Sequence, residues 1–384
     1  MSRRSSIQQI FDSGWSGYCT AYHPSDVQKK AAWSMMHCHT PSTGFNSMSC
    51  PDCGHIEIHY NSCRNRNCPN CQAILKELWI DARRSEVIDS PYFHLVFTVP
   101  ARLHPLLLAN QKLLYSLLHR CAADTVLSLA ADRKFLGAEV GIVQILHTWG
   151  QRLNYHPHIH AIVSGGGLTR DQKLKCTSQR FFLPLPVMSK VFRGKFLASL
   201  QDYYHSDHLS FPASLEHLCH PAEWGAFRNA LYQTDWNLFI KETFNGNGNA
   251  IEYLGRYANR IAITNSRILS VSDNEVRFSA FDYKSASKVT VSLSCQEFIR
   301  RFMLHILPAG FQKIRYYGFL KNRCKRKNLT LIFRLQGHQR FLQKFTGMST
   351  GELLKAAWGY DLQVCKVCGC RNMQHAGRGY PLRC

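Results

Sequence analysis

Two closely spaced cysteine pairs constrain this chain more than any other feature of its sequence. The segment SCPDCGHIEIHYNSCRNRNCPNCQ holds Cys50-x2-Cys53 and Cys68-x2-Cys71, and 14 residues separate the pairs. Each pair can bring two thiolates to one metal ion, and two pairs complete the tetrahedral shell that Zn²⁺ prefers. Residues 55–60, between the pairs, alternate in polarity as a strand does. The spacing therefore predicts a zinc ribbon in which these four cysteines bind one structural Zn²⁺.

The other cysteines fall into several groups. Cys38 and Cys63 lie near the predicted ribbon, where they either build a second metal site with neighbouring histidines or are ordinary packing residues. Cys365-x2-Cys368 has the form of another knuckle and is a candidate for a further zinc site, although its second half is irregular. Six cysteines are scattered along the chain, and we expect them to be small buried hydrophobic residues.

The chain carries a large positive charge that gathers in its last third. Its 384 residues contain 47 Lys and Arg against 25 Asp and Glu, a formal charge of +22, of which residues 251–384 contribute +16. The densest basic stretch includes Lys325, Arg326 and Lys327, and aromatic residues precede it. Basic side chains bind phosphates, and aromatic side chains stack on bases. We therefore expect nucleic acid as the partner and these three residues as nucleic-acid-binding residues, with a merely solvated surface as the alternative.

Composition and hydropathy exclude several other classes of protein. Hydrophobic residues make up 45% of the chain, too many for a mainly disordered protein. No run of about 18 apolar residues is present, so we expect no membrane span. The first 15 residues contain two arginines but no apolar run, which indicates that a signal peptide is absent. We expect a cytoplasmic, nucleoid-associated protein.

A histidine-rich segment follows two predicted strands. Residues 92–99 and 140–149 have the pattern of strands, and the segment YHPHIHAIVSGGG comes next. Strand alternation puts His158 and His160 on one face, where two imidazoles can chelate one divalent ion. The two histidines are therefore candidate ligands of a catalytic metal, although plain surface histidines would give the same pattern.

A tyrosine pair lies in a predicted helix about a hundred residues later. The segment AIEYLGRYANRIAI places Tyr253 and Tyr257 four residues apart, with Arg256 and Arg260 on the flank of the same face. Tyrosines at this spacing are usually packing residues. A neutral phenol is a poor nucleophile, but a divalent cation at a phosphate and arginines on its oxygens would favour attack by tyrosine. The tyrosines are therefore candidate nucleophiles, and the arginines are candidate DNA-binding residues.

In chain order, YNSCRNRNCPNC, HPHIH with GGG, and YLGRYANR resemble the two-tyrosine HUH transposases of the IS91 type. The resemblance extends from about residue 10 to about residue 320 and includes FHLVFTVP and LHTWGQRLNYHPHIHAIVSGGG. It implies a mobile-element enzyme that cleaves and rejoins single-stranded DNA through a covalent phosphotyrosine, in rolling-circle-like transposition. It also implies an antiparallel sheet with His158 and His160 on a central strand, and Tyr253 and Tyr257 on a helix beneath the metal.

The resemblance leaves the catalytic ion incompletely specified. We expect Mg²⁺ or Mn²⁺, because hard oxygen ligands from the substrate would complete the coordination shell. Gln144, His156 and Asn259 are candidates for a third protein ligand.

These observations predict an α+β protein with three parts. Residues 1–90 would form an N-terminal zinc-binding domain, and residues 91–320 an HUH catalytic domain built on an antiparallel sheet with helices. Residues 321–384 would form a basic C-terminal region with a second cysteine cluster. Two other functions stay open: a DNA-binding regulator without catalysis, and a metal-dependent nuclease in which water attacks the DNA.

Overall fold

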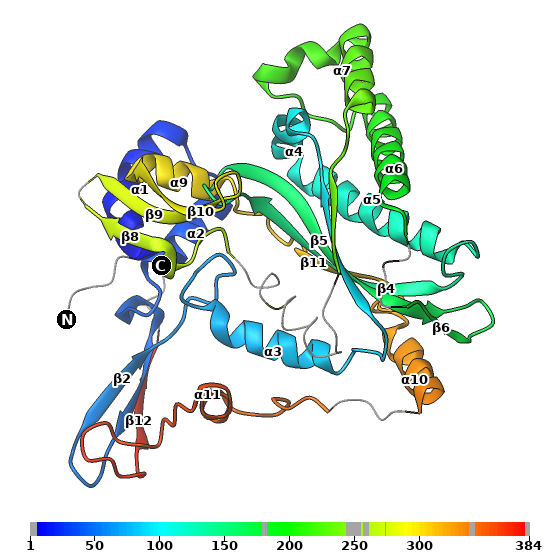
Figure 1. Cartoon of the computed structure of the whole chain (residues 1–384). Helices are drawn as coiled ribbons and strands as arrows, with labels where there is room; N and C mark the ends of the chain where they lie inside the picture. The colour runs from blue at the N-terminus through cyan, green and yellow to red at the C-terminus, as the bar shows by residue number, and fades with distance from the viewer. Residues whose placement is uncertain are drawn as a thin grey trace.

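Helices and antiparallel strands build the protein, as the sequence predicts. Its computed structural model contains three antiparallel sheets within the described residues (Figure 1). Tyr253, Arg256, Tyr257, Asn259 and Arg260 lie outside those residues. The structure describes residues 6–178, 181, 183–242, 255, 261–272, 274–337 and 342–380.

A six-stranded sheet forms the centre of the molecule. Its strands run in the order β11-β4-β5-β3-β7, and the short strand β6 pairs with the end of β5. The histidine strand β5 therefore lies between two neighbours, the central position that the family resemblance implies. The strands are β3 (Tyr92–Thr98), β4 (Glu139–Trp149), β5 (Tyr155–Leu168), β6 (Leu174–Cys176), β7 (Leu238–Glu242) and β11 (Ile314–Gly318).

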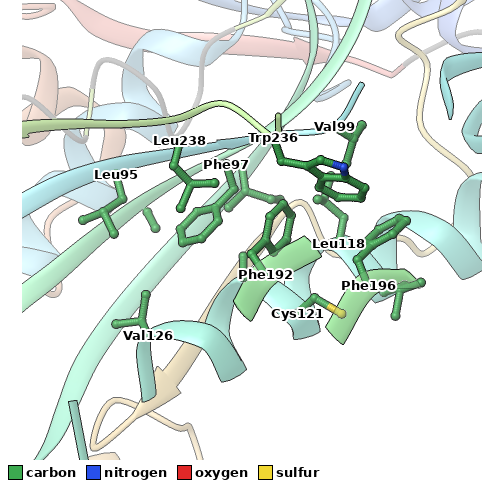
Figure 2. Packing of buried hydrophobic residues seen from close by; sticks show 14 of the residues in the cluster. Leu95, Phe97, Val99, Leu118, Cys121, Val126, Phe192, Phe196, Trp236 and Leu238 are labelled. Atoms are coloured by element: carbon green, nitrogen blue, oxygen red, sulfur yellow. The ribbon is translucent and has the colours of Figure 1, made fainter. Parts of the chain in front are cut away.

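The main hydrophobic core lies between one face of this sheet and a helical layer. Helix α5 has 21 residues without proline or glycine, and its leucine and alanine content favours a long helix. Phe97 on β3 packs edge to face on Phe192 of α6, and Phe192 packs in turn on Trp236 (Figure 2). This layer contains α4 (His104–Ala109), α5 (Gln111–Ala131), α6 (Leu185–His205) and α7 (Pro221–Gln233).

Two helices cover part of the opposite face. Leu329, Ile332 and Phe333 of α10 (Lys325–Gln336) form a buried cluster with residues of β4 and β5, and Trp79 of α3 (Gln72–Arg84) packs against it. The strand residues in this cluster include Val143, Ile145 and Ile162. By strand alternation, they share the sheet face that carries His158 and His160.

A second core joins the two halves of the sequence. Residues of α1 and α2 pack with α9 and a three-stranded sheet formed after residue 261. Helices α1 and α9 lie close together: a Cβ atom at Gly14 of α1 would lie 2.8 Å from the Cβ of Cys295, the first residue of α9. The elements are α1 (Ile7–Tyr22), α2 (Asp26–Met36), β8 (Ile268–Val271), β9 (Glu275–Asp282), β10 (Ser287–Ser294) and α9 (Cys295–Met303).

The third sheet contains strands from both ends of the chain. The hairpin of β1 (Phe45–Ser49) and β2 (Ile56–Tyr60) is extended by β12 (Gln374–Gly379), which pairs with β1. Figure 1 shows β12, in red, beside the blue hairpin that contains β2, at the bottom of the molecule, with α11 (Thr350–Trp358) on the path that leads there. The division at residues 90 and 320 stays a prediction. Among the described helices, none is both long and apolar enough to cross a bilayer.

Candidate functional site

Three histidine side chains meet on one face of the central sheet. His158 and His160 alternate along β5 with residues of the main core, and His147 on β4 pairs directly with His158. The Nε2 atoms of His158 and His160 are 3.1 Å apart, and one ring nitrogen from each of the three residues lies within 4.8 Å of the other two. All three side chains are buried. The donor set fits one divalent metal ion held by three imidazoles.

Hydrogen bonds on the far side of the rings fix their orientation. The Nδ1 of His158 lies 2.7 Å from the carbonyl oxygen of His156, so this nitrogen donates and Nε2 carries the lone pair that faces the cluster. The Nδ1 of His160 is hydrogen-bonded at 2.9 Å to the Nε2 of His94, whose ring stacks on that of His160. Partners of this kind hold ligating imidazoles in place in metal sites.

The third imidazole of the cluster was not among the ligands predicted from the sequence. Gln144 lies on the opposite face of β4 and is hydrogen-bonded to His119 of α5, so the prediction of Gln144 as a ligand is wrong. His156 lines the same cavity but lies outside the cluster of three, and Asn259 lies outside the described residues. His147 could have been found by pairing the two predicted strands as a hairpin, because that register puts His147 opposite His158.

A cavity of about 270 Å³ opens beside the three histidines. Its lining includes Trp149, whose ring stacks on His147, and Arg267, which donates hydrogen bonds to the carbonyls of Ser279 and Gln151. Tyr283, in the turn between β9 and β10, also lines it and is 76% exposed. Aromatic rings and a guanidinium beside the three clustered histidines suit a ligand that contains both bases and phosphates.

One described residue of the tyrosine segment, Gly255, packs against another helix. Gly255 is helical and buried, and a Cβ atom at this position would lie 2.3 Å from the Cδ1 of Ile80 on α3. Helix α3 packs through Trp79 on the sheet face that carries the histidines. Tyr253 and Tyr257, on either side of Gly255 in the sequence, lie outside the described residues.

The cysteines form two clusters, and the predicted grouping of the two knuckles is wrong. Cys50 and Cys53 lie at the tip of the β1–β2 hairpin, whereas Cys68 and Cys71 lie beyond its base, next to α3. The five residues of β2 span roughly 17 Å, too far for all four thiolates to reach one ion. Each pair lies instead beside two other cysteines. One cluster contains Cys38, Cys63, Cys68 and Cys71, and the other contains Cys50, Cys53, Cys365 and Cys368.

The geometry of the first cluster fits structural zinc. Cys71 Sγ lies 3.1 Å from Cys38 Sγ and 3.5 Å from Cys63 Sγ. A tetrahedron with Zn–S bonds of about 2.3 Å has edges of roughly 3.8 Å, so only small adjustments would be needed. Side-chain hydrogen bonds, that with Cys38 first among them, hold the pKa of Cys71 below its usual range. The pKa of Cys38 is lowered as well, whereas the pKa values of Cys63 and Cys68 are raised, so two of the four sulfur atoms favour the thiolate, the form that binds metal.

The three basic residues of α10 differ in their surroundings. Lys325 Nζ lies 2.6 Å from Oε1 of the buried Glu86 and 5.2 Å from the centre of the Tyr316 ring, so its charge is engaged within the protein. Arg326 and Lys327 are exposed. Only these last two present their charge to a partner at the surface.

Comparisons with known proteins identify the class of protein to which this architecture belongs. A family model described as "Transposase zinc-binding domain" matches residues 10–99, and one described as "Putative transposase" matches residues 141–328. Both matches lie in order along one chain. The first match includes the N-terminal cysteine pairs, and the second includes the three clustered histidines.

Two curated relatives then define the family. The chain is 40% identical over 308 residues to "Putative transposase y4qJ" of Sinorhizobium fredii, over 79% of this chain and 77% of the relative. It is 31% identical over 363 residues to "Transposase for insertion sequence element IS801" of Pseudomonas savastanoi pv. phaseolicola, over 91% of this chain and 84% of the relative. The chain belongs to the IS91 and IS801 family of transposases, which confirms the resemblance seen in the sequence. No solved structure matches it.

Family membership and geometry together support two general statements. The protein is a transposase, an enzyme that acts on DNA. Its N-terminal region is a zinc-binding domain, and cysteines of that region supply ligands for structural zinc.

Proposed function

We propose that this transposase cleaves and rejoins single-stranded DNA through a covalent phosphotyrosine intermediate. The observation that carries the proposal is the cluster of His147, His158 and His160, which faces a cavity lined by aromatic rings and a guanidinium. Tyr253 and Tyr257 are the proposed nucleophiles. In support, Gly255, between them in the sequence, packs on a helix that covers the histidine face of the sheet.

The reaction exchanges one phosphoester bond for another. The phenolic oxygen forms a bond to phosphorus, the bond from phosphorus to one DNA oxygen breaks, and the phenolic proton ends on the departing hydroxyl. His147, His158 and His160 would hold a divalent ion, which would supply charge neutralisation at the scissile phosphate. Because the phosphodiester bond energy is kept in the phosphotyrosine, attack by a DNA hydroxyl reverses the step and rejoins a strand. Two tyrosines allow two successive transfers without release of the DNA.

The three imidazole ligands influence which divalent ion the site binds. Imidazole nitrogen binds transition-metal ions better than Mg²⁺, which favours oxygen ligands and retains its water. Three protein imidazoles therefore favour Mn²⁺ over Mg²⁺ at this site, while phosphate oxygens of the DNA would fill the remaining positions. We propose that the enzyme works with either ion and binds Mn²⁺ more tightly.

The walls of the cavity favour a single strand over a duplex. Tyr283, which is 76% exposed, offers a ring face on which an unpaired base can stack, whereas the bases of a duplex are already stacked on one another. Arg267 is held in place by hydrogen bonds to two backbone carbonyls, and its guanidinium adds positive charge to the wall of the cavity beside the histidines. Arg256 and Arg260 are proposed as further phosphate-binding residues on the basis of sequence.

A denaturing gel tests the proposal. The protein is incubated with labelled single-stranded oligonucleotides from an element end and Mn²⁺, and a protein–DNA band that survives denaturation is expected. The band should vanish in the double variant Tyr253→Phe/Tyr257→Phe and in His158→Ala. It should persist in Tyr232→Phe, which alters an exposed tyrosine outside the site. DNA cleavage that produces no covalent band, and that persists in the double variant, would refute phosphotyrosine chemistry and favour attack by water.

A further inference from the structure

We infer that the chain binds a second structural Zn²⁺ between its two ends, through Cys50 and Cys53 of the N-terminal hairpin and Cys365 and Cys368 of the C-terminal segment. The matched zinc-binding domain ends at residue 99 and the second family match at residue 328, so neither includes the C-terminal pair. The inference concerns the architecture of the protein and is independent of the chemistry proposed at the histidines.

The two cysteine pairs adopt the same backbone turn. In the N-terminal turn, Cys50 N–H donates to the carbonyl five residues later at 2.8 Å, and Gly54 N–H donates to the Cys50 carbonyl at 2.9 Å. In the C-terminal turn, Cys365 N–H donates to the carbonyl five residues later at 2.8 Å, and Gly369 N–H donates to the Cys365 carbonyl at 2.9 Å. Both glycines have φ of 72°, which favours glycine in this position. The segments are therefore a matched pair of metal knuckles.

The sulfur atoms of the two knuckles lie at the distances that a shared zinc ion requires. Cys50 Sγ is 3.6 Å from Cys368 Sγ, and Cys53 Sγ is 3.6 Å from Cys365 Sγ. The expected edge of a ZnS₄ tetrahedron is roughly 3.8 Å for Zn–S bonds of about 2.3 Å. All four sulfur atoms lie within 4.8 Å of one another. Each knuckle contributes one buried and one exposed cysteine, so the site lies at the surface end of the sheet.

The sheet that carries the knuckles has little else to stabilise it. Each knuckle precedes an outer strand, β2 or β12, and β1 lies between them. The buried cluster here consists of Cys50, Cys365 and Met373, two of which are proposed ligands. Three short strands with so small a core are marginal in water, and metal ligation is the usual remedy in small domains. Zinc would therefore supply much of the free energy that holds β12 on β1.

Polar contacts at the same place show that the pairing of the two ends is specific. Lys366, within the C-terminal knuckle, forms an ion pair with Glu57 on β2. Asn372 Nδ2 donates to Asp52 Oδ1 at 3.2 Å, which joins the loops of the two knuckles. These contacts fix the relative position of segments more than 300 residues apart in the sequence. The proposed zinc site is thus a clamp on the two ends of the folded chain.

A fifth thiol stands next to the clamp. Cys370 Sγ lies 3.2 Å from Cys50 Sγ and 3.1 Å from Cys368 Sγ. Its position in the C-terminal turn corresponds to that of His55 in the N-terminal turn, five residues after the first cysteine of the knuckle. Because the two turns match, the first and fourth residues of each supply the ligands. Cys370 is then a neighbour rather than a ligand, and the zinc content of Cys370→Ser tests this directly.

Zinc content per full-length chain tests the clamp. Purified wild-type protein should contain two cysteine-bound zinc ions, Cys365→Ser/Cys368→Ser one, and Cys38→Ser/Cys63→Ser one, each counted in a His158→Ala background so that zinc at the imidazoles is not included. Cys370→Ser and the exposed-cysteine control Cys176→Ser should retain two. One zinc ion in the wild type, or two in Cys365→Ser/Cys368→Ser, would overturn the inference.

Hydrogen exchange separates loss of the clamp from general unfolding. In Cys365→Ser/Cys368→Ser, amide protection should fall in residues 45–49 and 374–379 and stay unchanged in residues 159–163 of the central sheet. Protection that stays unchanged at 374–379 would refute the clamp, because β12 would then pair without zinc. Neither measurement involves DNA cleavage, so failure of the phosphotyrosine proposal would leave both results untouched.

Discussion

Replacement of His147 by alanine gives the sharpest test of the metal site, because no sequence pattern pointed to this residue. His147 faces His158 across the β4–β5 pair and supplies one of the three clustered ring nitrogens. Its removal would leave two imidazoles, too few protein ligands to hold a divalent ion tightly. His156→Ala is the matched control, because His156 lines the same cavity but lies outside the cluster.

The expected loss of metal affinity depends on whether a residue binds the ion or only orients a residue that binds it. Loss of a partner that only orients a ligand typically lowers metal affinity by about 10- to 100-fold. His94, which is hydrogen-bonded to His160, is such a partner, so His94→Phe should fall in that range. Loss of a residue that binds the ion should lower the metal affinity by at least the upper limit of that range. For His147→Ala we therefore expect at least about a 100-fold weaker Mn²⁺ affinity, or about 2.7 kcal/mol.

The assay is electron paramagnetic resonance of free Mn²⁺ during titration of protein that carries zinc at its cysteine clusters only, because excess zinc would also occupy the three imidazoles. The predicted order of Mn²⁺ affinity is wild type and His156→Ala first, His94→Phe next and His147→Ala last. Affinity of His147→Ala within threefold of the wild type would refute the three-imidazole site. Loss of binding in His156→Ala equal to that in His147→Ala would refute the assignment of the third ligand.

Three further predictions concern DNA affinity, pH dependence and the core. Combined replacement of Arg326 and Lys327 by alanine should lower the salt dependence of single-strand binding by about 1.4, at about 0.7 per phosphate contact, whereas Lys325→Ala should leave it unchanged because that charge is paired with a buried carboxylate; equal slopes in a fluorescence-anisotropy salt titration would contradict this. Burial lowers the pKa of His119 to about 3, below the value of about 6.5 in an unfolded chain, so the stability contributed by this neutral imidazole is complete above pH 6.5 and is lost as the pH falls toward 3. Between pH 6 and pH 4, the free energy of urea unfolding should therefore fall by up to about 1.4 kcal/mol per pH unit more in the wild type than in His119→Leu, and identical slopes would contradict this. Phe192→Ala should lower the free energy of unfolding by about 3–5 kcal/mol, because the ring is fully buried between β3 and Trp236; a loss below about 1 kcal/mol would show that the core in Figure 2 is packed differently.

Short-range patterns predicted the central sheet and part of its site. Alternation along residues 155–163 assigned His158 and His160 to one strand face, and both lie there. This works because strand periodicity depends on the local backbone alone. His147 was not predicted as a ligand, because its role depends on the register between two strands, which the turn at residues 150–154 sets. An explicit hairpin alignment would have revealed it.

Long-range pairing explains why the cysteines were grouped wrongly. The spacing of Cys50-x2-Cys53 and Cys68-x2-Cys71 correctly indicated two knuckles. It could not reveal that one knuckle would join residues about 300 positions later, because no local pattern encodes the pairing of β1 with β12. Lys325 illustrates a similar limit, since a basic run in sequence does not show which member turns inward to a buried glutamate.

Peptide mapping of the covalent adduct tests the central claim most directly. Trypsin cleaves after Lys241, Arg256 and Arg260, so Tyr253 and Tyr257 fall in different peptides, 242–256 and 257–260. After reaction with a single-stranded oligonucleotide and nuclease trimming, mass spectrometry should find a nucleotide joined through phosphate to one or both of these peptides. A nucleotide joined to any other peptide, or DNA cleavage with no joined peptide at all, would contradict tyrosine attack at the histidine-bound metal.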